Sequence, residues 1–179
     1  MRVLVAYGSK RGGTEGIAKI IGGALRSVGL QADVMPAGDV RELSLYDAVI
    51  VGGSLYANRW HRDARDLVRR HERELLGRPV WLFSSGPLDD SADRRDLPPV
   101  SQVRRLLTHI NARGHETFGG RLEKNARGLI AGAMAKKHAG DWRNPARIHR
   151  WAIGVAQQLR PMMPPQGKQP SKPKQPPGP

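Results

Sequence analysis

The chain has 179 residues, of which 30 are lysine or arginine and 16 are acidic, so its formal net charge is +14. It contains no cysteine, which excludes disulfides, thiolate metal sites, iron–sulfur clusters and cysteine nucleophiles. The positive field can attract anionic small molecules, an anionic membrane surface or nucleic acid. However, no RNA-binding aromatic motif or zinc-finger spacing supports a nucleic-acid partner. Without a membrane-length apolar run or a signal peptide, a cytoplasmic protein is expected.

The first predicted strand, residues 2–7, is a short apolar run typical of a buried parallel strand. The segment Gly8-Ser9-Lys10-Arg11-Gly12-Gly13-Thr14 follows, and apolar residues then recur at helical spacing from Ile17 to Val28. The start of a helix has unpaired N–H groups and partial positive charge, so glycines and hydroxyls there can hold a phosphate. The alternative is an ordinary turn with Thr14 as the N-cap. The spacing excludes a Walker P-loop and the dinucleotide fingerprint.

The next part of the chain predicts two more strands. Gly29 is expected to end the first helix. Residues 30–36 then predict an edge strand. Residues 46–53 are apolar on both faces, which indicates a central parallel strand. This strand leads into Ser54–Asn58, a second polar loop after a pair of glycines.

The middle of the chain continues the alternation of helix and strand. An amphipathic helix is predicted over residues 59–76 and a buried strand over residues 79–83. The strand runs into a third loop, Ser84–Leu88. Residues 89–99 predict a surface loop. A helix marked by Val100 to Ile110 and an edge strand over residues 115–121 follow.

The last part predicts helices over residues 122–137 and 145–159, with Asn144 as N-cap and Pro145 as the first helical residue of the second. From residue 161 onward proline, glutamine, lysine and glycine dominate, which predicts a disordered tail. We therefore divide the chain into a domain of residues 1–160 and a tail of residues 161–179.

This alternation predicts a parallel sheet with helices on both faces, and such folds bind ligands beyond the carboxyl ends of the strands. The loops after the first, third and fourth predicted strands are all rich in glycine or hydroxyls. A phosphate-bearing ligand at this edge is therefore expected. Tyr56 and Trp60 can either stack on a flat ring of that ligand or pack in the core.

No catalytic side chain is identified, so the catalytic residues are left unknown. None of the six histidines lies in a nucleophile motif. His71 is expected to be a half-buried residue with a hydrogen-bond partner, whereas His61 can contact a ligand or cap a helix. No cluster has metal-ligand spacing, and the aspartates of residues 89–93 are expected to be solvated. These observations favour a bound cofactor that supplies the chemistry.

Four segments carry a resemblance to a known family. Residues 3–18 resemble the phosphate-loop signature of flavodoxin-like proteins, and residues 46–56 resemble their third strand and isoalloxazine loop. Residues 78–88 and the late Gly-Asp-Trp-Arg-Asn, 140–144, are similar to the branch that includes menaquinone-dependent protoporphyrinogen dehydrogenase.

The resemblance implies a flavodoxin-like three-layer α/β sandwich, a parallel five-stranded sheet of order 2-1-3-4-5, and non-covalent FMN. By motif position, the phosphate is expected at Ser9, Lys10, Arg11, Gly12, Gly13 and Thr14. The flavin ring is expected between Ser54, Leu55, Tyr56 and Ala57 on one side and Ser84, Ser85, Gly86 and Pro87 on the other.

The resemblance also implies an FMN-dependent oxidoreductase that passes electrons from an organic substrate to a quinone, with protoporphyrinogen IX as a candidate substrate. The basic surface is expected to favour peripheral contact with anionic lipid at the inner face of the membrane. The first alternative is a flavodoxin-type electron carrier without its own substrate. The second is a flavodoxin-like scaffold without flavin.

Overall fold

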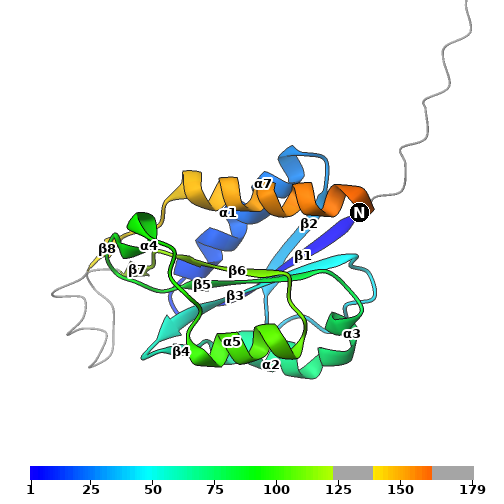
Figure 1. Ribbon diagram of the computed structural model, residues 1–179, viewed down its shortest axis with the longest axis horizontal. Helices are drawn as coiled ribbons and strands as arrows, with labels where there is room; N and C mark the ends of the chain where they lie inside the picture. The colour runs from blue at the N-terminus through cyan, green and yellow to red at the C-terminus, as the bar shows by residue number, and fades with distance from the viewer. Residues whose placement is uncertain (123–138, 163–179) are drawn as a thin grey trace, which may run out of the picture.

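A computed structural model describes residues 1–122 and 139–162, in which a parallel sheet lies between two layers of helices (Figure 1). The strand order is β2-β1-β3-β5-β6, and all four pairings are parallel. Counting these five strands in chain order gives 2-1-3-4-5, so the predicted order is confirmed. The bounds of these strands are β1 Arg2–Gly8, β2 Gln31–Pro36, β3 Ala48–Tyr56, β5 Val80–Ser85 and β6 Gly114–Phe118.

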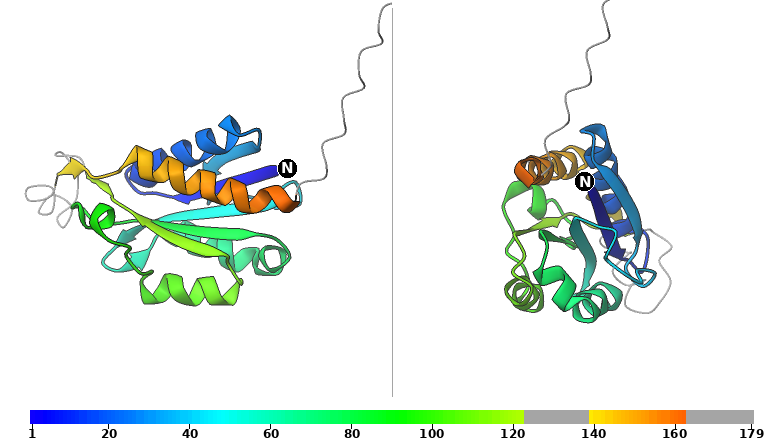
Figure 2. Two further views of the ribbon diagram at one scale, coloured as in Figure 1. Left: turned by 45° about the horizontal axis from the view of Figure 1, so that its top comes forward. Right: turned by 90° about the vertical axis from the view of Figure 1, so that its right-hand side faces the viewer.

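One helical layer covers each face of the sheet (Figure 2). The first layer consists of α1 Gly13–Ser27 and α7 Pro145–Leu159. The second contains α2 Arg62–Arg70, α3 Glu72–Leu76 and α5 Ser101–His109. Three short pairing strands and two short helical segments complete the description: β4 Arg59–Trp60, β7 Arg121–Leu122, β8 Gly140–Asp141, α4 Ser91–Arg94 and η1 Arg160–Met162.

The sheet divides the core into two clusters. Ile50 of β3 packs on the side of α1 and α7, while Val49 and Val51 pack on the side of α2 and α5. All three side chains are fully buried. Burial on both faces explains the unbroken apolar run that predicted a central strand.

The predicted stop of the first helix at Gly29 is confirmed. Gly29 has φ of 87°, a backbone conformation that glycine adopts without steric cost. Its N–H donates to the carbonyl of Arg26 at 3.1 Å, and the N–H of Leu30 donates to that of Leu25 at 3.1 Å. This pair of hydrogen bonds is a Schellman motif, which satisfies the last carbonyls of α1.

In the first half of the chain, one of the alternatives left open and one local prediction are wrong. Thr14 is not the N-cap of α1, because Gly12, with φ of 73°, turns the chain into the helix two residues earlier. The single helix over residues 59–76 is instead β4, α2 and α3. The break occurs at His71, where φ of −110° and ψ of 22° leave the helical range. As expected, His71 is buried and has a partner, with its Nδ1 2.7 Å from Oε1 of Glu74.

Several boundaries in the second half also differ. The fifth strand ends at Phe118 rather than at residue 121, because Arg121 and Leu122 pair with β8 instead. The predicted loop over residues 89–99 contains α4, whose Ala92 is buried. The predicted helix 145–159, with its Asn144 cap, is confirmed as α7. The helix predicted over 122–137 and the disordered tail lie outside the described residues, except for Leu122 in β7 and residues 161–162 in η1.

Candidate cofactor-binding site

A cavity of about 1160 Å³ opens at the carboxyl edge of the sheet, between the three loops singled out in the sequence. Twelve of the fourteen residues expected to bind the cofactor line it. They are Ser9, Lys10, Arg11, Gly13, Thr14, Ser54, Leu55, Tyr56, Ala57, Ser85, Gly86 and Pro87. The other two, Gly12 and Ser84, are not among its lining residues.

The first loop brings the start of α1 to the cavity wall. Gly13 is the first residue of the helix, and its position leaves the N–H groups of the first turn at the cavity. Thr14 is 1% exposed, and its Oγ1 has no hydrogen-bond partner among the residues that the structure describes. A buried hydroxyl without a partner costs about 1–3 kcal/mol, which indicates that a ligand atom completes the site.

The loop is held in place by His61, at the start of α2. A Cβ on Gly8 would lie only 2.8 Å from Nδ1 of His61, so the ring packs directly on the end of β1. The same Nδ1 accepts a hydrogen bond from the N–H of Asp63 at 3.3 Å. His61 therefore caps α2 and also lines the cavity, so neither role expected for it excludes the other.

The second loop is shorter than predicted, because β3 continues through Ser54 to Tyr56 instead of ending at residue 53, and a tight hairpin then leads into β4. Ala57 and Asn58 both have positive φ, 47° and 57°, and Tyr56 pairs with Arg59 across the turn. Tyr56 is 46% exposed at the cavity. Trp60 is 1% exposed, and a Cβ on Gly53 would lie 2.6 Å from its Nε1. Tyr56 is therefore the accessible aromatic ring of the pair, and Trp60 packs in the core.

The third loop is fixed by β6. The N–H of Gly86 donates to the carbonyl of Phe118 at 3.0 Å, and the N–H of Gly120 donates to that of Pro87 at 2.8 Å. Ser84, predicted as the first residue of this loop, lies instead in β5, fully buried, with its Oγ 2.9 Å from Nε2 of His115. This contact explains why Ser84 does not face the cavity. Burial lowers the pKa of His115 to about 4, so the ring stays neutral near pH 7.

Residues from the second half of the chain also line the cavity and were not predicted from the sequence. Thr117, Gly120, Arg121 and Leu122 come from the end of β6 and from β7. The rule that ligands bind beyond the carboxyl ends of strands applies to β6 as well. If the end of this strand had been predicted at Phe118, the same rule would have indicated Thr117 and Gly120. Four further lining residues were singled out in the sequence without being assigned to the cofactor: Asn58 and Leu88 in the predicted loops, and Trp60 and His61 as possible ligand contacts. The remaining lining residues, which were not predicted, are Arg59, Arg62, Asp89, Leu97 and Pro98.

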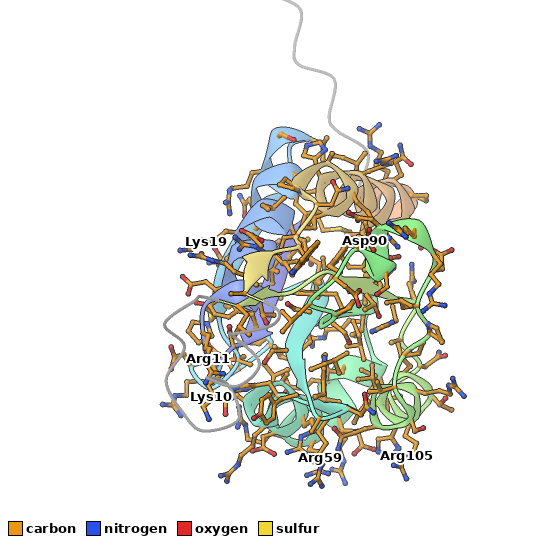
Figure 3. The ribbon with its side chains drawn as sticks, turned by 90° about the vertical axis from the view of Figure 1, so that its left-hand side faces the viewer. Lys10, Arg11, Lys19, Arg59, Asp90 and Arg105 are labelled. Carbon is orange, nitrogen blue, oxygen red and sulfur yellow. The ribbon has the colours of Figure 1, made fainter. Side chains whose placement is uncertain are left out.

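The cavity is strongly cationic. Five lining residues carry positive charge, and Asp89 is the single carboxylate among the lining residues that the structure describes. The five are Lys10, Arg11, Arg59, Arg62 and Arg121. Figure 3 shows Lys10 and Arg11 close together at the first loop and Arg59 farther along the same face. A site with this charge favours anionic ligands.

No group of three or more histidine, cysteine, aspartate or glutamate side chains that could hold a metal ion occurs within residues 1–122 and 139–162. In the same ranges, no helix is long and apolar enough to cross a bilayer.

The chain is similar to a known family and to several known proteins. The family model described as a flavodoxin domain matches residues 4–137. The chain is 26% identical over 109 residues to a protoporphyrinogen IX dehydrogenase (quinone) of Escherichia coli strain K12, a match that spans 60% of each chain.

The fold is similar to that of a Pseudomonas aeruginosa flavodoxin (C101S mutant), with a TM-score of 0.61 and 19% identity, over 89% of this chain and 99% of that one. It is also similar to part of the rubredoxin:oxygen oxidoreductase of Desulfovibrio gigas, with a TM-score of 0.61 and 15% identity, over 89% of this chain and 36% of that one.

Proposed function

We propose that this chain, which belongs to the flavodoxin domain family, is an FMN-dependent oxidoreductase that passes electrons from an organic substrate to a quinone. Membership of the family implies FMN as the cofactor. When bound, FMN supplies reversible two-electron redox chemistry. The protein therefore needs to bind and orient the cofactor and the substrate, and none of its own side chains has to be oxidised or reduced.

The observation that carries the proposal is the buried hydroxyl of Thr14 at the start of α1, which lines the cavity without a partner among the described residues. This donor, with the N–H groups of the first helical turn, fits the phosphate of FMN. In this proposal Ser9, Lys10, Arg11, Gly13 and Thr14 hold the phosphate, and Gly12 supplies the turn that starts the helix.

The other two loops fit a flat ring. In the proposal Ser54, Leu55, Tyr56 and Ala57 flank one side of the flavin, and Tyr56 has the exposed ring surface for stacking. Ser85, Gly86 and Pro87 close the opposite edge. Ser84 does not contact the flavin in this proposal, because its side chain is hydrogen-bonded to His115.

Protoporphyrinogen IX is the substrate we propose to test first. The similarity to the Escherichia coli enzyme supports this choice, and the cationic cavity suits the carboxylates of a porphyrin. The same positive charge supports contact with anionic lipid, where a quinone acceptor is available.

The first experiment is an FMN titration of the purified protein, followed by flavin fluorescence. Saturable uptake is expected, and a chain that takes up no FMN would leave the flavin-free scaffold as the better description. The second is anaerobic turnover of protoporphyrinogen IX with a menaquinone analogue. Turnover supports the enzyme. If the protein shows no turnover but its reduced FMN passes electrons to a redox protein, the result supports an electron carrier.

The flavodoxin-type carrier is the second candidate. It is supported by the similarity of the whole fold to a flavodoxin, which covers 99% of that protein. The carrier predicts that reduced protein gives up electrons to a protein acceptor faster than to a quinone analogue.

Contact with lipid needs its own test, because it is independent of redox activity. Sedimentation with vesicles of phosphatidylcholine alone and with added phosphatidylglycerol measures it. Binding only to the anionic vesicles, lost at high salt, is the expected result.

A further inference from the structure

Residues 140–144, Gly-Asp-Trp-Arg-Asn, are left without a role by the proposed function. Two of them have structural tasks. The N–H of Trp142 donates to the carbonyl of Gly120 at 2.9 Å, and Oδ1 of Asn144 accepts from the N–H of Arg147 at 3.1 Å to cap α7. The side chains of Asp141 and Arg143 are engaged with each other instead.

Asp141 and Arg143 form a bidentate ion pair. Nε of Arg143 donates to Oδ1 of Asp141 at 2.7 Å, and Nη2 donates to Oδ2 at 2.5 Å. The Arg143 side chain is 15% exposed. The hydrogen bond to Arg143 lowers the pKa of Asp141, and the same bond raises the pKa of Arg143, so both groups are charged at neutral pH. A planar guanidinium bound at two points has a fixed orientation.

This fixed guanidinium lies against the first turn of α1. Its Nη1 is 3.5 Å from the carbonyl oxygen of Gly13. A Cβ on Gly16 would lie 1.9 Å from the same nitrogen, so the absence of a side chain at Gly16 makes the contact possible. Arg143 itself is not among the residues that line the cavity.

A cation at this place needs an explanation. The N-terminus of a helix carries partial positive charge, so a guanidinium beside it is electrostatically unfavourable. Asp141 and the carbonyl of Gly13 offset part of this repulsion. An anion bound at the first turn would add an attraction between the guanidinium and the bound ligand. The arrangement is therefore one that a bound phosphate stabilises.

We propose that Arg143, held by Asp141, is a positioning residue that fixes the first turn of α1 for the phosphate of the cofactor. The inference rests on the proposed function, because it assumes that FMN binds with its phosphate at Gly13 and Thr14. The inference adds Arg143, which is 130 positions from Gly13 in the sequence, to the residues that prepare the phosphate site. Arg143 acts through its contact with the backbone of Gly13 and occupies the space left by the missing side chain of Gly16.

The test compares FMN with riboflavin, which has the same ring but no phosphate. Both dissociation constants are measured by fluorescence titration of the full chain. The key variant is Gly16→Ala, whose methyl group would displace the Arg143 guanidinium from the first turn while leaving Arg143 and Asp141 in the sequence. Alanine also favours the helix by about 1 kcal/mol relative to glycine, so folding is not lost.

The matched control is Gly23→Ala in the same helix, where an added Cβ meets nothing within 4 Å. We expect Gly16→Ala to raise the FMN dissociation constant about tenfold or more and to change that of riboflavin less than about twofold. Gly23→Ala is expected to leave both constants unchanged. Arg143→Gln should match Gly16→Ala, and Arg143→Lys should fall between it and the wild type, since lysine keeps the charge but not the two-point contact.

Two outcomes overturn the inference and are distinct from a failure of the proposed function. If the wild type binds FMN and Gly16→Ala leaves the ratio of FMN to riboflavin affinity unchanged, Arg143 does not position the phosphate end. If both affinities fall together, its role is general stability. A wild type that binds neither flavin contradicts the proposed function itself, and the phosphate role of Arg143 with it.

Discussion

At the first turn of α1, Thr14 places a hydroxyl in a buried position where the described residues offer it no partner. An unpaired buried hydroxyl destabilises the protein on its own and is useful only when a ligand completes it. We therefore expect the hydroxyl of Thr14 to destabilise the free protein and to stabilise its complex with FMN.

We expect Thr14→Val to separate these two effects. The free energy of unfolding without cofactor should stay equal or rise by about 1 kcal/mol, because valine has a similar shape and no unpaired hydroxyl. The FMN dissociation constant should rise about tenfold, since a hydrogen bond to a charged phosphate is lost. Urea unfolding and fluorescence titration measure the two quantities. Thr108→Val on the exposed side of α5 is the control, and an unchanged FMN affinity in Thr14→Val would contradict the site.

His115 is a second residue whose chemistry follows from burial. Its ordinary pKa of 6.5 is lowered to about 4 in the folded protein by desolvation. The unfolded chain therefore binds a proton more readily than the folded one. Stability is fully present above pH 6.5 and is lost as the pH falls toward 4.

Between pH 6.5 and pH 4, His115 is expected to lower the free energy of unfolding by up to about 3 kcal/mol. His115→Gln keeps a hydrogen-bonding group near Ser84 but does not titrate. The urea-unfolding free energy of this variant should fall less between pH 6.5 and pH 5 than that of the wild type. His149→Gln, on the exposed surface of α7, is the control. Parallel profiles for wild type and His115→Gln would show that His115 is not the cause.

At the scale of secondary-structure elements, Arg147 connects three segments that are distant in sequence. From the first turns of α7, its Nη2 lies 2.5 Å from Oε1 of Glu116 in β6 and 3.3 Å from Oδ1 of Asp96. Its Nη1 lies 4.0 Å from Oδ1 of Asp93 in α4. Glu116 is partly buried, and burial raises its pKa while Arg147 opposes that rise. The segment before α5, which borders the cavity at Leu97 and Pro98, is thereby tied to α7.

Arg147→Met should destabilise the protein by about 2 kcal/mol at pH 7, because it leaves the Glu116 carboxylate partly buried without its main partner. Adding Glu116→Gln should recover part of that loss, since the second change removes the unpaired charge. A double-mutant cycle by urea unfolding measures the coupling. Strict additivity of the two changes would mean that the pair is not coupled.

At the scale of the whole molecule, the formal net charge of +14 and the cationic cavity act in the same direction. Long-range attraction between opposite charges accelerates association and is screened by salt. The dianionic phosphate of FMN makes the cofactor itself a probe of this field.

The FMN association rate is therefore expected to fall several-fold between about 20 mM and 300 mM salt, whereas the riboflavin rate should change little. Arg59→Glu combined with Arg62→Glu should weaken the salt dependence, because both residues line the cavity outside the phosphate loop. Arg150→Glu, on the exposed surface of α7 and away from the cavity, is the control, because it also replaces a positive charge with a negative one. Stopped-flow fluorescence measures the rates. If the salt dependence of the rate is the same in the wild type and in the double variant, the attraction comes from the remaining charges.

Much of the arrangement could be predicted from local patterns. The central position of β3 follows from its apolar residues on both faces, because such a strand is stable only when covered twice. The ends of α1 and α7 at Gly29 and Asn144 are set by backbone conformation and capping within a few residues. The three loops meet because parallel strands present their carboxyl ends at one edge.

Other features were decided only by tertiary contacts. Trp60 lies outside the helix predicted over 59–76 because its indole packs over Gly53 and its backbone N–H donates to Oε1 of Gln102 in α5 at 3.0 Å. Ser84 leaves the cavity because His115, on the neighbouring strand, accepts or donates to its hydroxyl. The contact of Arg143 with Gly13 joins positions whose proximity no local pattern encodes. The sequence by itself determined that the sheet is parallel, that β3 is central and at which edge the cavity forms, since these depend on periodicity and chain direction. The strand order was implied by the resemblance to flavodoxin-like proteins. The tertiary structure decided which side chains face that site, because orientation depends on partners from elsewhere in the chain.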